Sequence, residues 1–169
     1  MFKKTLVFLC VSLAIWASTP VVLEYPDVLH YAQEKLPCEG TLQMTQDGFL
    51  YVEVSKDYVF QLIPLLLKDK EVVCPPPYFG EGKVGAHITV AMGSEIGNRK
   101  DPIPYLGQKI AFSILRLEKV DLQESVLEAK TVYLLSVESS QIAEIRKKLG
   151  LSSKIRGHDF HITIAVDCP

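Results

Sequence analysis

The sequence lacks several features by which many functional classes are recognised. It has no run of Lys and Arg longer than three residues, no Cys-x-x-Cys pair and a single tryptophan among its 169 residues. Proteins that hold long nucleic acid carry clustered positive charge, so we expect no long duplex nucleic acid as a partner. Zinc sites need ligands at close and regular spacing, so the sequence predicts no metal site and no cofactor.

A transmembrane helix needs about 20 consecutive apolar residues, and the chain has no such run. The longest mostly apolar stretch is Thr5–Trp16. It follows the basic start Met1–Lys4 and precedes the small residues and proline of Ala17–Pro20. This three-part layout predicts a secretory signal peptide over residues 1–17 and a single domain over 18–169. A buried N-terminal strand or helix is the alternative. We therefore expect a secreted or periplasmic protein with no stable membrane anchor.

The charge that remains after signal removal limits the kind of ligand. Without Lys3 and Lys4, 16 basic residues face 20 acidic ones, a net charge of about −4. Such a mildly acidic chain suits a small ligand, or one phosphate at the end of an RNA, better than a long polyanion.

Three cysteines lie beyond the predicted signal peptide: Cys38, Cys74 and Cys168. In an oxidising compartment, one structural disulfide or none is expected, and all three pairings are open. A structural role is favoured over a catalytic cysteine.

Two strings of four residues are nearly identical: His87-Ile88-Thr89-Val90 and His161-Ile162-Thr163-Ile164. The chain has only four histidines, and two of them occupy this same context. In a strand, successive side chains point to opposite faces, so each histidine shares a face with the threonine two residues later. One such string alone is more often ordinary strand chemistry. Two of them, on strands that lie side by side, would gather two imidazoles and two hydroxyls on one polar surface.

The first half of the chain reads as an ordered series of elements. They are strands at 41–45 and 49–55 around an Asp47-Gly48 turn, a helix at 56–67 capped by Ser55 and kinked or shortened by Pro64, a loop at 68–82 and a strand at 84–92.

The second half repeats this order. It has a strand at 131–137, a helix at 141–149 capped by Ser139 or Ser140 and ended by Gly150, a loop at 152–157 and a strand at 159–166. An irregular connection at 93–107 and an alternating strand at 109–120 lie between the halves. Each half, about 41–92 and 109–166, is therefore strand, helix, loop and motif strand, an arrangement that would bring His87 and His161 together.

Paired His-x-Thr motifs at matching places in two such halves resemble the 2H phosphoesterase superfamily, which includes RNA 2',3'-cyclic phosphodiesterases. The resemblance covers about Thr41 to Val166, and both motifs are intact. It implies an α+β, bilobal fold in which two pseudo-symmetric strand-helix-strand halves with antiparallel sheets surround a central cleft. It also implies metal-free chemistry on a cyclic or linear phosphodiester.

The chemistry of such a hydrolysis assigns roles to the four motif residues. One of His87 and His161 acts as base toward water and the other as acid toward the leaving oxygen, in an order that the sequence leaves open. Thr89 and Thr163 would donate hydrogen bonds to the phosphate as charge builds on its oxygens.

Other residues are candidates for substrate contacts. Tyr78, beside Phe79, could stack on a base at the cleft rim. Lys83, Lys154 and Arg156 lie in the loops that enter the motif strands, where a cation could meet a phosphate, and His158 could support His161. His30 lies outside both halves and is assigned no role.

We therefore expect a metal-independent phosphodiesterase that hydrolyses the 2',3'-cyclic phosphate of a nucleotide or RNA end, or a related cyclic nucleotide. The expected partner is this small substrate, and the expected state is a monomer. The alternatives are a secreted module that binds a nucleotide without turnover and a disulfide-stabilised interaction protein whose motifs are coincidental.

Overall fold

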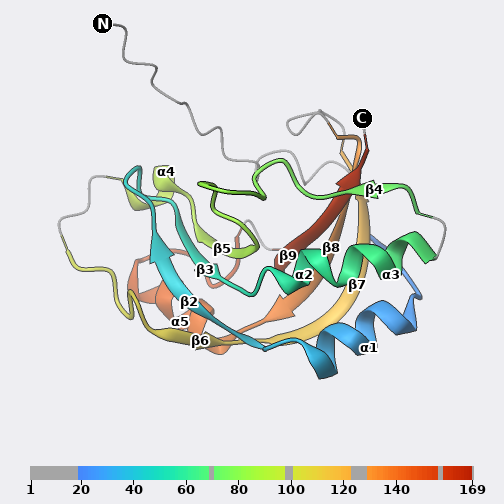
Figure 1. The fold of residues 1–169 in the computed structure, drawn as a ribbon. Helices are drawn as coiled ribbons and strands as arrows, with labels where there is room; N and C mark the ends of the chain where they lie inside the picture. The colour runs from blue at the N-terminus through green and yellow to red at the C-terminus, as the bar shows by residue number, and fades with distance from the viewer. Residues whose placement is uncertain (1–18, 69–70, 98–100, 123–128, 156–157, 169) are drawn as a thin grey trace, which may run out of the picture.

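The computed structural model describes residues 19–68, 71–97, 101–122, 129–155 and 158–168 (Figure 1). The predicted signal peptide, residues 1–17, lies outside these ranges. Within them, no helix combines the length and the apolar character that a membrane crossing requires.

Helices and strands are interspersed along the chain. In order they are β1 (Val21–Val22), α1 (Pro26–Lys35), β2 (Glu39–Met44), β3 (Leu50–Glu53), α2 (Asp57–Phe60), α3 (Leu62–Lys68), β4 (Val73–Cys74), β5 (His87–Ala91), α4 (Gly93–Ile96), β6 (Lys109–Ala111), β7 (Ser113–Asp121), β8 (Thr131–Glu138), α5 (Ser140–Lys148) and β9 (Phe160–Asp167).

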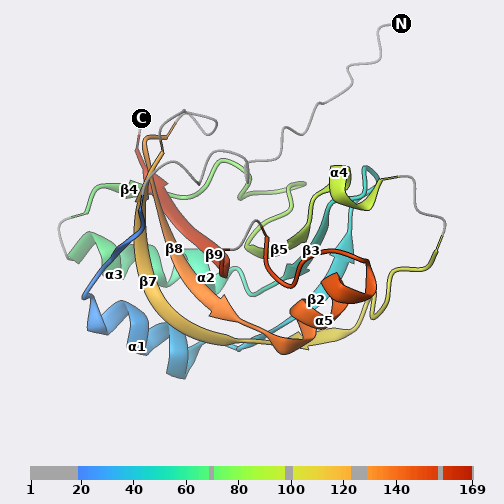
Figure 2. The same cartoon turned by 180° about the vertical axis from the view of Figure 1, so that it is seen from behind.

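The strands form one sheet of nine strands in the order β1-β7-β8-β9-β5-β3-β2-β6, with β4 on β9. Every pairing is antiparallel, which confirms the predicted α+β class. The strands of the two halves belong to this one sheet, because β5 and β9 pair directly. Figure 2 shows that the sheet is strongly curved, with α1 and α3 near β7 at one side of the molecule and α5 near β2 and β6 at the other.

Both predicted helices form, but the cap predicted for the first is shifted by one residue. Ser55 lies just before the observed N-cap Lys56, which makes no side-chain cap bond, although Ser55 Oγ accepts a hydrogen bond from the Asp57 N–H at 3.2 Å. Pro64 has no N–H to donate and its ring crowds the carbonyl four residues earlier, so the first helix is interrupted at Gln61 between α2 and α3. In the second half, Ser139 Oγ accepts a hydrogen bond from the Ile142 N–H at 3.3 Å and caps α5. Gly150 follows with φ of 71°, the left-handed conformation that ends a helix.

The remaining differences from the expected elements lie in the connections. The segment 109–120, predicted as one strand, is two, because β6 pairs with β2 and β7 pairs with β8. The loop predicted at 68–82 contains the end of α3 and the two-residue β4, which pairs with β9. The irregular connection begins with the single turn of α4. No element was assigned before residue 41, where α1 and β1 lie.

The main hydrophobic core lies on one face of the motif strands. Ile88 and Ile162, which lie opposite each other, are both 0% exposed. They belong to the same buried cluster as apolar residues of every long helix: Val28 and Ala32 of α1, Tyr58, Val59, Leu62 and Leu66 of α2 and α3, and Ile142 and Ile145 of α5. Since side chains alternate along a strand, the histidines and threonines lie on the opposite face.

A disulfide joins Cys74 of β4 to Cys168, just after β9, and closes a sequence separation of 94 residues. Cys38 is free and half-buried. The structure thus selects one of the three pairings that the sequence left open.

We expect replacement of both Cys74 and Cys168 by Ala to lower the free energy of unfolding by about 2–5 kcal/mol, because the unfolded chain gains the freedom that the long closed loop removes. Urea unfolding of the oxidised protein and the variant measures this difference. Cys38→Ala, which removes the free thiol, is the matched control and should change stability less. Equal unfolding midpoints for the double variant and this control would contradict the expectation.

Candidate active site

The two motifs meet through the register of the central strands. Ile88 lies opposite Ile162 in an antiparallel pair. One residue on either side, this register sets His87 opposite Thr163 and Thr89 opposite His161, all four on the face away from the helices. Side chains opposite each other in such pairs have Cβ atoms about 4.5–5.5 Å apart. Each histidine therefore neighbours the threonine of the other motif.

His87 is enclosed by aromatic rings. Its ring centroid lies 5.6 Å from that of Phe49, 5.8 Å from that of Tyr51 and 5.0 Å from that of Tyr78. Its Nδ1–H donates to the Gly85 carbonyl at 2.7 Å, which leaves Nε2 as the acceptor nitrogen. Burial lowers the pKa of His87 to about 4, although the bond to the Gly85 carbonyl opposes this change. At neutral pH His87 is therefore an uncharged imidazole that can accept a proton.

His161 is held in the same way by a hydrogen bond to the backbone of Asp159, two residues earlier. Burial lowers the pKa of His161, whereas this backbone bond and the negative charge of Glu118 oppose the lowering. Each motif histidine thus donates a hydrogen bond to the backbone carbonyl two residues before it. This bond fixes the orientation of the ring and keeps the proton on the ring nitrogen that donates.

The threonines lie deep on the same face, with Thr89 7% and Thr163 6% exposed. The hydroxyl of Tyr78 shares a side-chain hydrogen bond with Thr163, and burial raises the pKa of Tyr78 to about 12. Tyr78, which the sequence suggests as a substrate contact, touches both motifs, through His87 and through Thr163.

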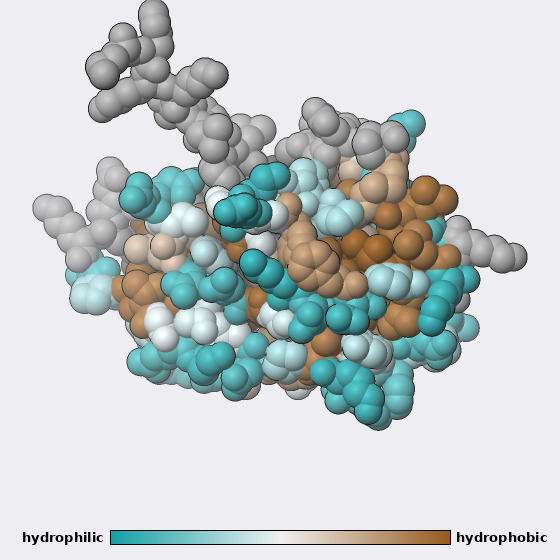
Figure 3. All heavy atoms as spheres, in the orientation of Figure 1, coloured by the Kyte–Doolittle hydropathy of each residue, from teal (hydrophilic) through white to brown (hydrophobic). Residues whose placement is uncertain are grey.

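The neighbouring Phe79 fixes the loop that carries Tyr78. Its ring packs edge-on against Phe60 of α2, with centroids 5.0 Å apart. In the space-filling view, apolar surface gathers over α2 and α3 (Figure 3), where Phe60 and Leu67 are exposed. Phe79 therefore anchors the proline-rich loop to the helices, and Tyr78 points from that loop to the sheet.

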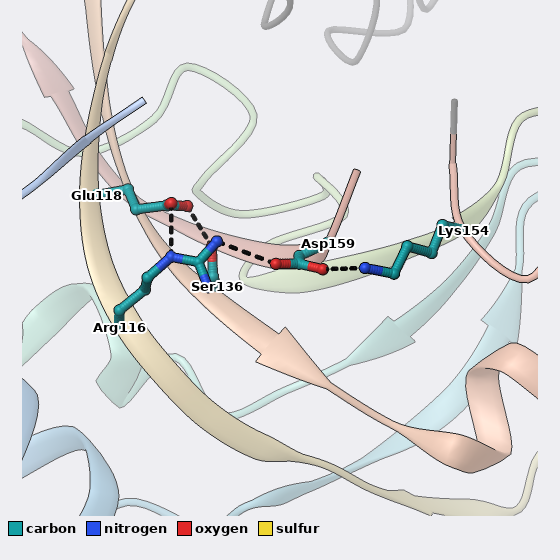
Figure 4. Close-up of polar contacts among 5 residues, drawn as sticks. All are labelled: Arg116, Glu118, Ser136, Lys154 and Asp159. Carbon is teal, nitrogen blue, oxygen red and sulfur yellow. Dashed lines mark hydrogen bonds and ion pairs between the residues drawn. The ribbon is translucent and has the colours of Figure 1, made fainter. Parts of the chain in front are cut away.

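A charged network of side chains from β7, β8 and the segments before β9 is drawn in Figure 4, and its members line the same pocket as His161. Arg116 Nε donates to Glu118 at 2.8 Å and Arg116 Nη2 donates to Asp159 at 3.0 Å. Ser136 Oγ also donates to Glu118, and Lys154 Nζ donates to Asp159 at 2.5 Å. Sequence reasoning missed Arg116 and Glu118. The alternation of side chains along β7 shows that Arg116 and Glu118 share a face. The sequence does not show which strand lies beside that face.

A pocket of about 200 Å³ opens beside this network. Its polar lining includes Arg116, Glu118, Ser136, Lys154, His158 and His161. Two of the weaker candidates, Lys154 and His158, therefore lie near a motif histidine.

The other candidates lie elsewhere. Lys83 is exposed, and its Nζ donates to the Pro77 carbonyl at 2.5 Å, a contact within its own loop. Arg156 lies outside the described residues. His30, which was assigned no role, is exposed on α1 and pairs with Glu34.

Arg146 of α5 supports the site from beneath and was also missed. Its side chain is 1% exposed, and its guanidinium donates to the carbonyls of Val90, Ser152 and Lys154 and to the carboxylate of Glu95. These bonds tie α5 to the first motif strand and to the loop that leads toward the second.

Among the described residues, no group of three or more His, Cys, Asp and Glu side chains is placed to hold a metal ion. The four motif residues instead offer proton transfer by two imidazoles and hydrogen bonding by two hydroxyls, which together suit an anionic group that changes its charge during a reaction.

Comparison with known protein families identifies the family of the chain. A family profile described as Swiss Army Knife, 2H phosphoesterase domain, matches residues 50–168, a range that begins at β3 and contains both motifs. Searches of curated proteins and of solved structures found no significant match.

We expect Tyr78→Ala to raise the pKa of His87 toward its ordinary value, because the ring that covers the imidazole is removed and water reaches it. Tyr78→Phe keeps the ring, loses the hydroxyl on Thr163 and should leave the pKa of His87 low. NMR titration of the histidine ring signals distinguishes the variants. A His87 pKa that is the same in Tyr78→Ala and wild type would show that this ring does not enclose the imidazole.

Proposed function

Because the chain belongs to the 2H phosphoesterase family, we propose that it is a metal-independent phosphodiesterase whose paired histidines hydrolyse a cyclic phosphodiester. The observation that supports the proposal most is the pairing of Ile88 with Ile162, because extending this register by one residue on either side puts His87 opposite Thr163 and Thr89 opposite His161. The substrate class is the 2',3'-cyclic phosphate of a nucleotide or of an RNA end, or a related cyclic nucleotide.

In the proposed reaction the phosphate lies over the four motif residues. The hydroxyls of Thr89 and Thr163 donate to its non-bridging oxygens, where negative charge grows as water attacks. One imidazole takes a proton from the water, and the other gives a proton to the sugar oxygen that leaves. The phosphorus gains one P–O bond and loses one, and the pair of histidines ends with the same number of protons.

The surroundings of the site support a small substrate. Drug-sized ligands occupy pockets of about 300–1,000 Å³, so the pocket of about 200 Å³ beside His161 would hold one part of a nucleotide. On the other side of the site, the rings of Phe49 and Tyr51 stack with centroids 5.4 Å apart and offer an aromatic surface to a base.

The proposal includes the larger arrangement that the family resemblance implies. The two halves, about 41–92 and 109–166, would form the pseudo-symmetric walls of a central cleft above the motifs. The protein would act as a monomer, after loss of residues 1–17, in a secreted or periplasmic setting on a small nucleotide or RNA terminus.

The electrostatics favour turnover over simple capture of a nucleotide. A module that only binds a phosphate gains from fixed positive charge. Here burial lowers the pKa of both His87 and His161 and so favours the neutral form of each imidazole. Neutral imidazoles serve proton transfer better than they serve anion binding.

We expect His87→Ala and His161→Ala each to reduce kcat/KM about 10²- to 10⁴-fold on 2',3'-cyclic nucleotides, because each removes a proton-transfer group. The assay uses the mature protein in EDTA, followed by separation of the 2'- and 3'-phosphate products. His30→Ala removes an exposed histidine on α1 and should keep full activity.

Hydrolysis that stops in EDTA and returns with a divalent ion would contradict a metal-independent mechanism. A wild-type rate equal to that of the doubly substituted protein on every cyclic phosphate would contradict the hydrolase itself. Tight nucleotide binding without turnover would favour the binding module.

We also expect the kcat/KM profile to peak on the acid side of the ordinary histidine pKa, about 6.5. Turnover needs one imidazole neutral and the other protonated. Burial lowers both pKa values, that of His87 to about 4. The form of the pair with one proton is therefore populated at lower pH than it would be for two exposed histidines. Measurement of kcat/KM from pH 4 to 9 tests this, and a maximum above pH 7 would contradict it.

A further inference from the structure

The two histidines have different surroundings. His87 on β5 faces the rings of Phe49, Tyr51 and Tyr78. His161 on β9 faces a charged network drawn from three other segments. Its charged and titratable members are Arg116 and Glu118 of β7, Lys154 after α5, and His158 and Asp159 before β9.

Glu118 is the most enclosed carboxylate of this network. Its side chain is 7% exposed, against 26% for Asp159. It accepts hydrogen bonds from Arg116 Nε and from Ser136 Oγ. Ser136 is the register partner of His161 on one side and of Arg116 on the other, whereas Glu118 lies opposite Leu134, two residues along. The hydrogen bond from Ser136 Oγ therefore brings the Glu118 carboxylate diagonally to the place beside His161. Both Glu118 and His161 line the pocket.

We propose that Glu118 is a positioning residue that keeps the shared proton of the pair on His161, which makes His161 the general acid and His87 the general base. This assignment rests on the proposed function. The assignment also predicts how the substrate is oriented. The leaving oxygen and its attached group lie toward the pocket beside His161, and the attacking water lies toward His87.

The other charges of the network do not cancel this effect of Glu118. Arg116 is 39% exposed and divides its hydrogen bonds between Glu118 and Asp159, while Lys154 pairs with Asp159. His158 is exposed and opposes a proton on His161. The negative charge of Glu118 favours the protonated form of His161, and a charge on His161 lowers the pKa of His87 further. When the pair carries one proton, that proton is therefore held on His161 rather than on His87.

The step balances with this assignment. A water proton moves to Nε2 of His87 as the water oxygen bonds to phosphorus. The bond from phosphorus to the sugar oxygen breaks, its electron pair stays on that oxygen, and the proton of His161 is transferred to it. The product is a phosphate monoester and a free hydroxyl, and a proton must return to His161 before the next cycle.

NMR titration of the four histidines tests the pairing without any need for activity. In wild type, His161 should titrate at higher pH than His87. Glu118→Gln keeps an oxygen to accept from Arg116 or Ser136 but removes the charge, so the pKa of His161 should fall. Glu53→Gln is the matched control, because Glu53 is the register partner of His87 and is exposed, so screening by water should leave both imidazoles unchanged.

Leaving-group dependence tests the roles. A p-nitrophenolate ion departs without a proton, so His161→Ala should lose about 10²-fold or more on a 2',3'-cyclic nucleotide but less than about tenfold on bis(p-nitrophenyl) phosphate. His87→Ala should lower the rate by similar factors on the cyclic nucleotide and on bis(p-nitrophenyl) phosphate. Glu118→Gln should lose on the order of tenfold on the cyclic substrate, with the high-pH limb of its profile moved to lower pH.

A His161 that titrates below His87, or that does not respond to Glu118→Gln, would overturn the proposal, as would the opposite leaving-group pattern for the two histidine variants. Absence of turnover by the wild-type protein on every substrate, with the titration as expected, would overturn the proposed function and with it the catalytic roles, but would leave the pairing of Glu118 with His161 intact.

Discussion

The site depends on one constraint, the antiparallel pairing of β5 with β9 in which Ile88 lies opposite Ile162. Both isoleucines are fully buried against the helices, so burial of apolar surface fixes the register. A shift of the register by one residue would bury His87 and His161 in the core and expose the isoleucines, and both changes would destabilise the folded state. The same hydrophobic contact that stabilises the domain therefore aligns the four polar residues of the motifs.

The enclosure of the site adds chemistry to this alignment. Tyr78, held by a loop that Phe79 anchors on α2, covers His87 and reaches Thr163, so two residues from one loop link both motifs to the helices. Burial favours the neutral form of both imidazoles, and the fixed carboxylate of Glu118 makes the pair unequal. Two nearly identical sequence strings thus acquire different proton affinities from strands and loops that they do not contain.

The elements predicted from sequence were those whose causes are local. The alternation of the motif strands, the Ser139 cap, Gly150 at the end of α5 and the break caused by Pro64 all act within a few residues. The two-residue β4 and the Cys74–Cys168 pair depend on a partner strand far along the chain, so no local pattern marks them. The place of Tyr78 could not be predicted, because its loop has no periodicity. The strand alternation puts Arg116 and Glu118 on one face, but only the pairing of β7 with β8 and β8 with β9 brings that face to His161.

The central claim is that both motifs act on one phosphodiester in a single step. The most direct measurement is a double-mutant cycle of kcat/KM for wild type, His87→Ala, His161→Ala and the protein that carries both substitutions. If the histidines act as one unit, removal of the second after the first changes the rate by only a few-fold, as expected for groups that work together. Losses that multiply across the cycle would show two independent contributions and contradict the shared site.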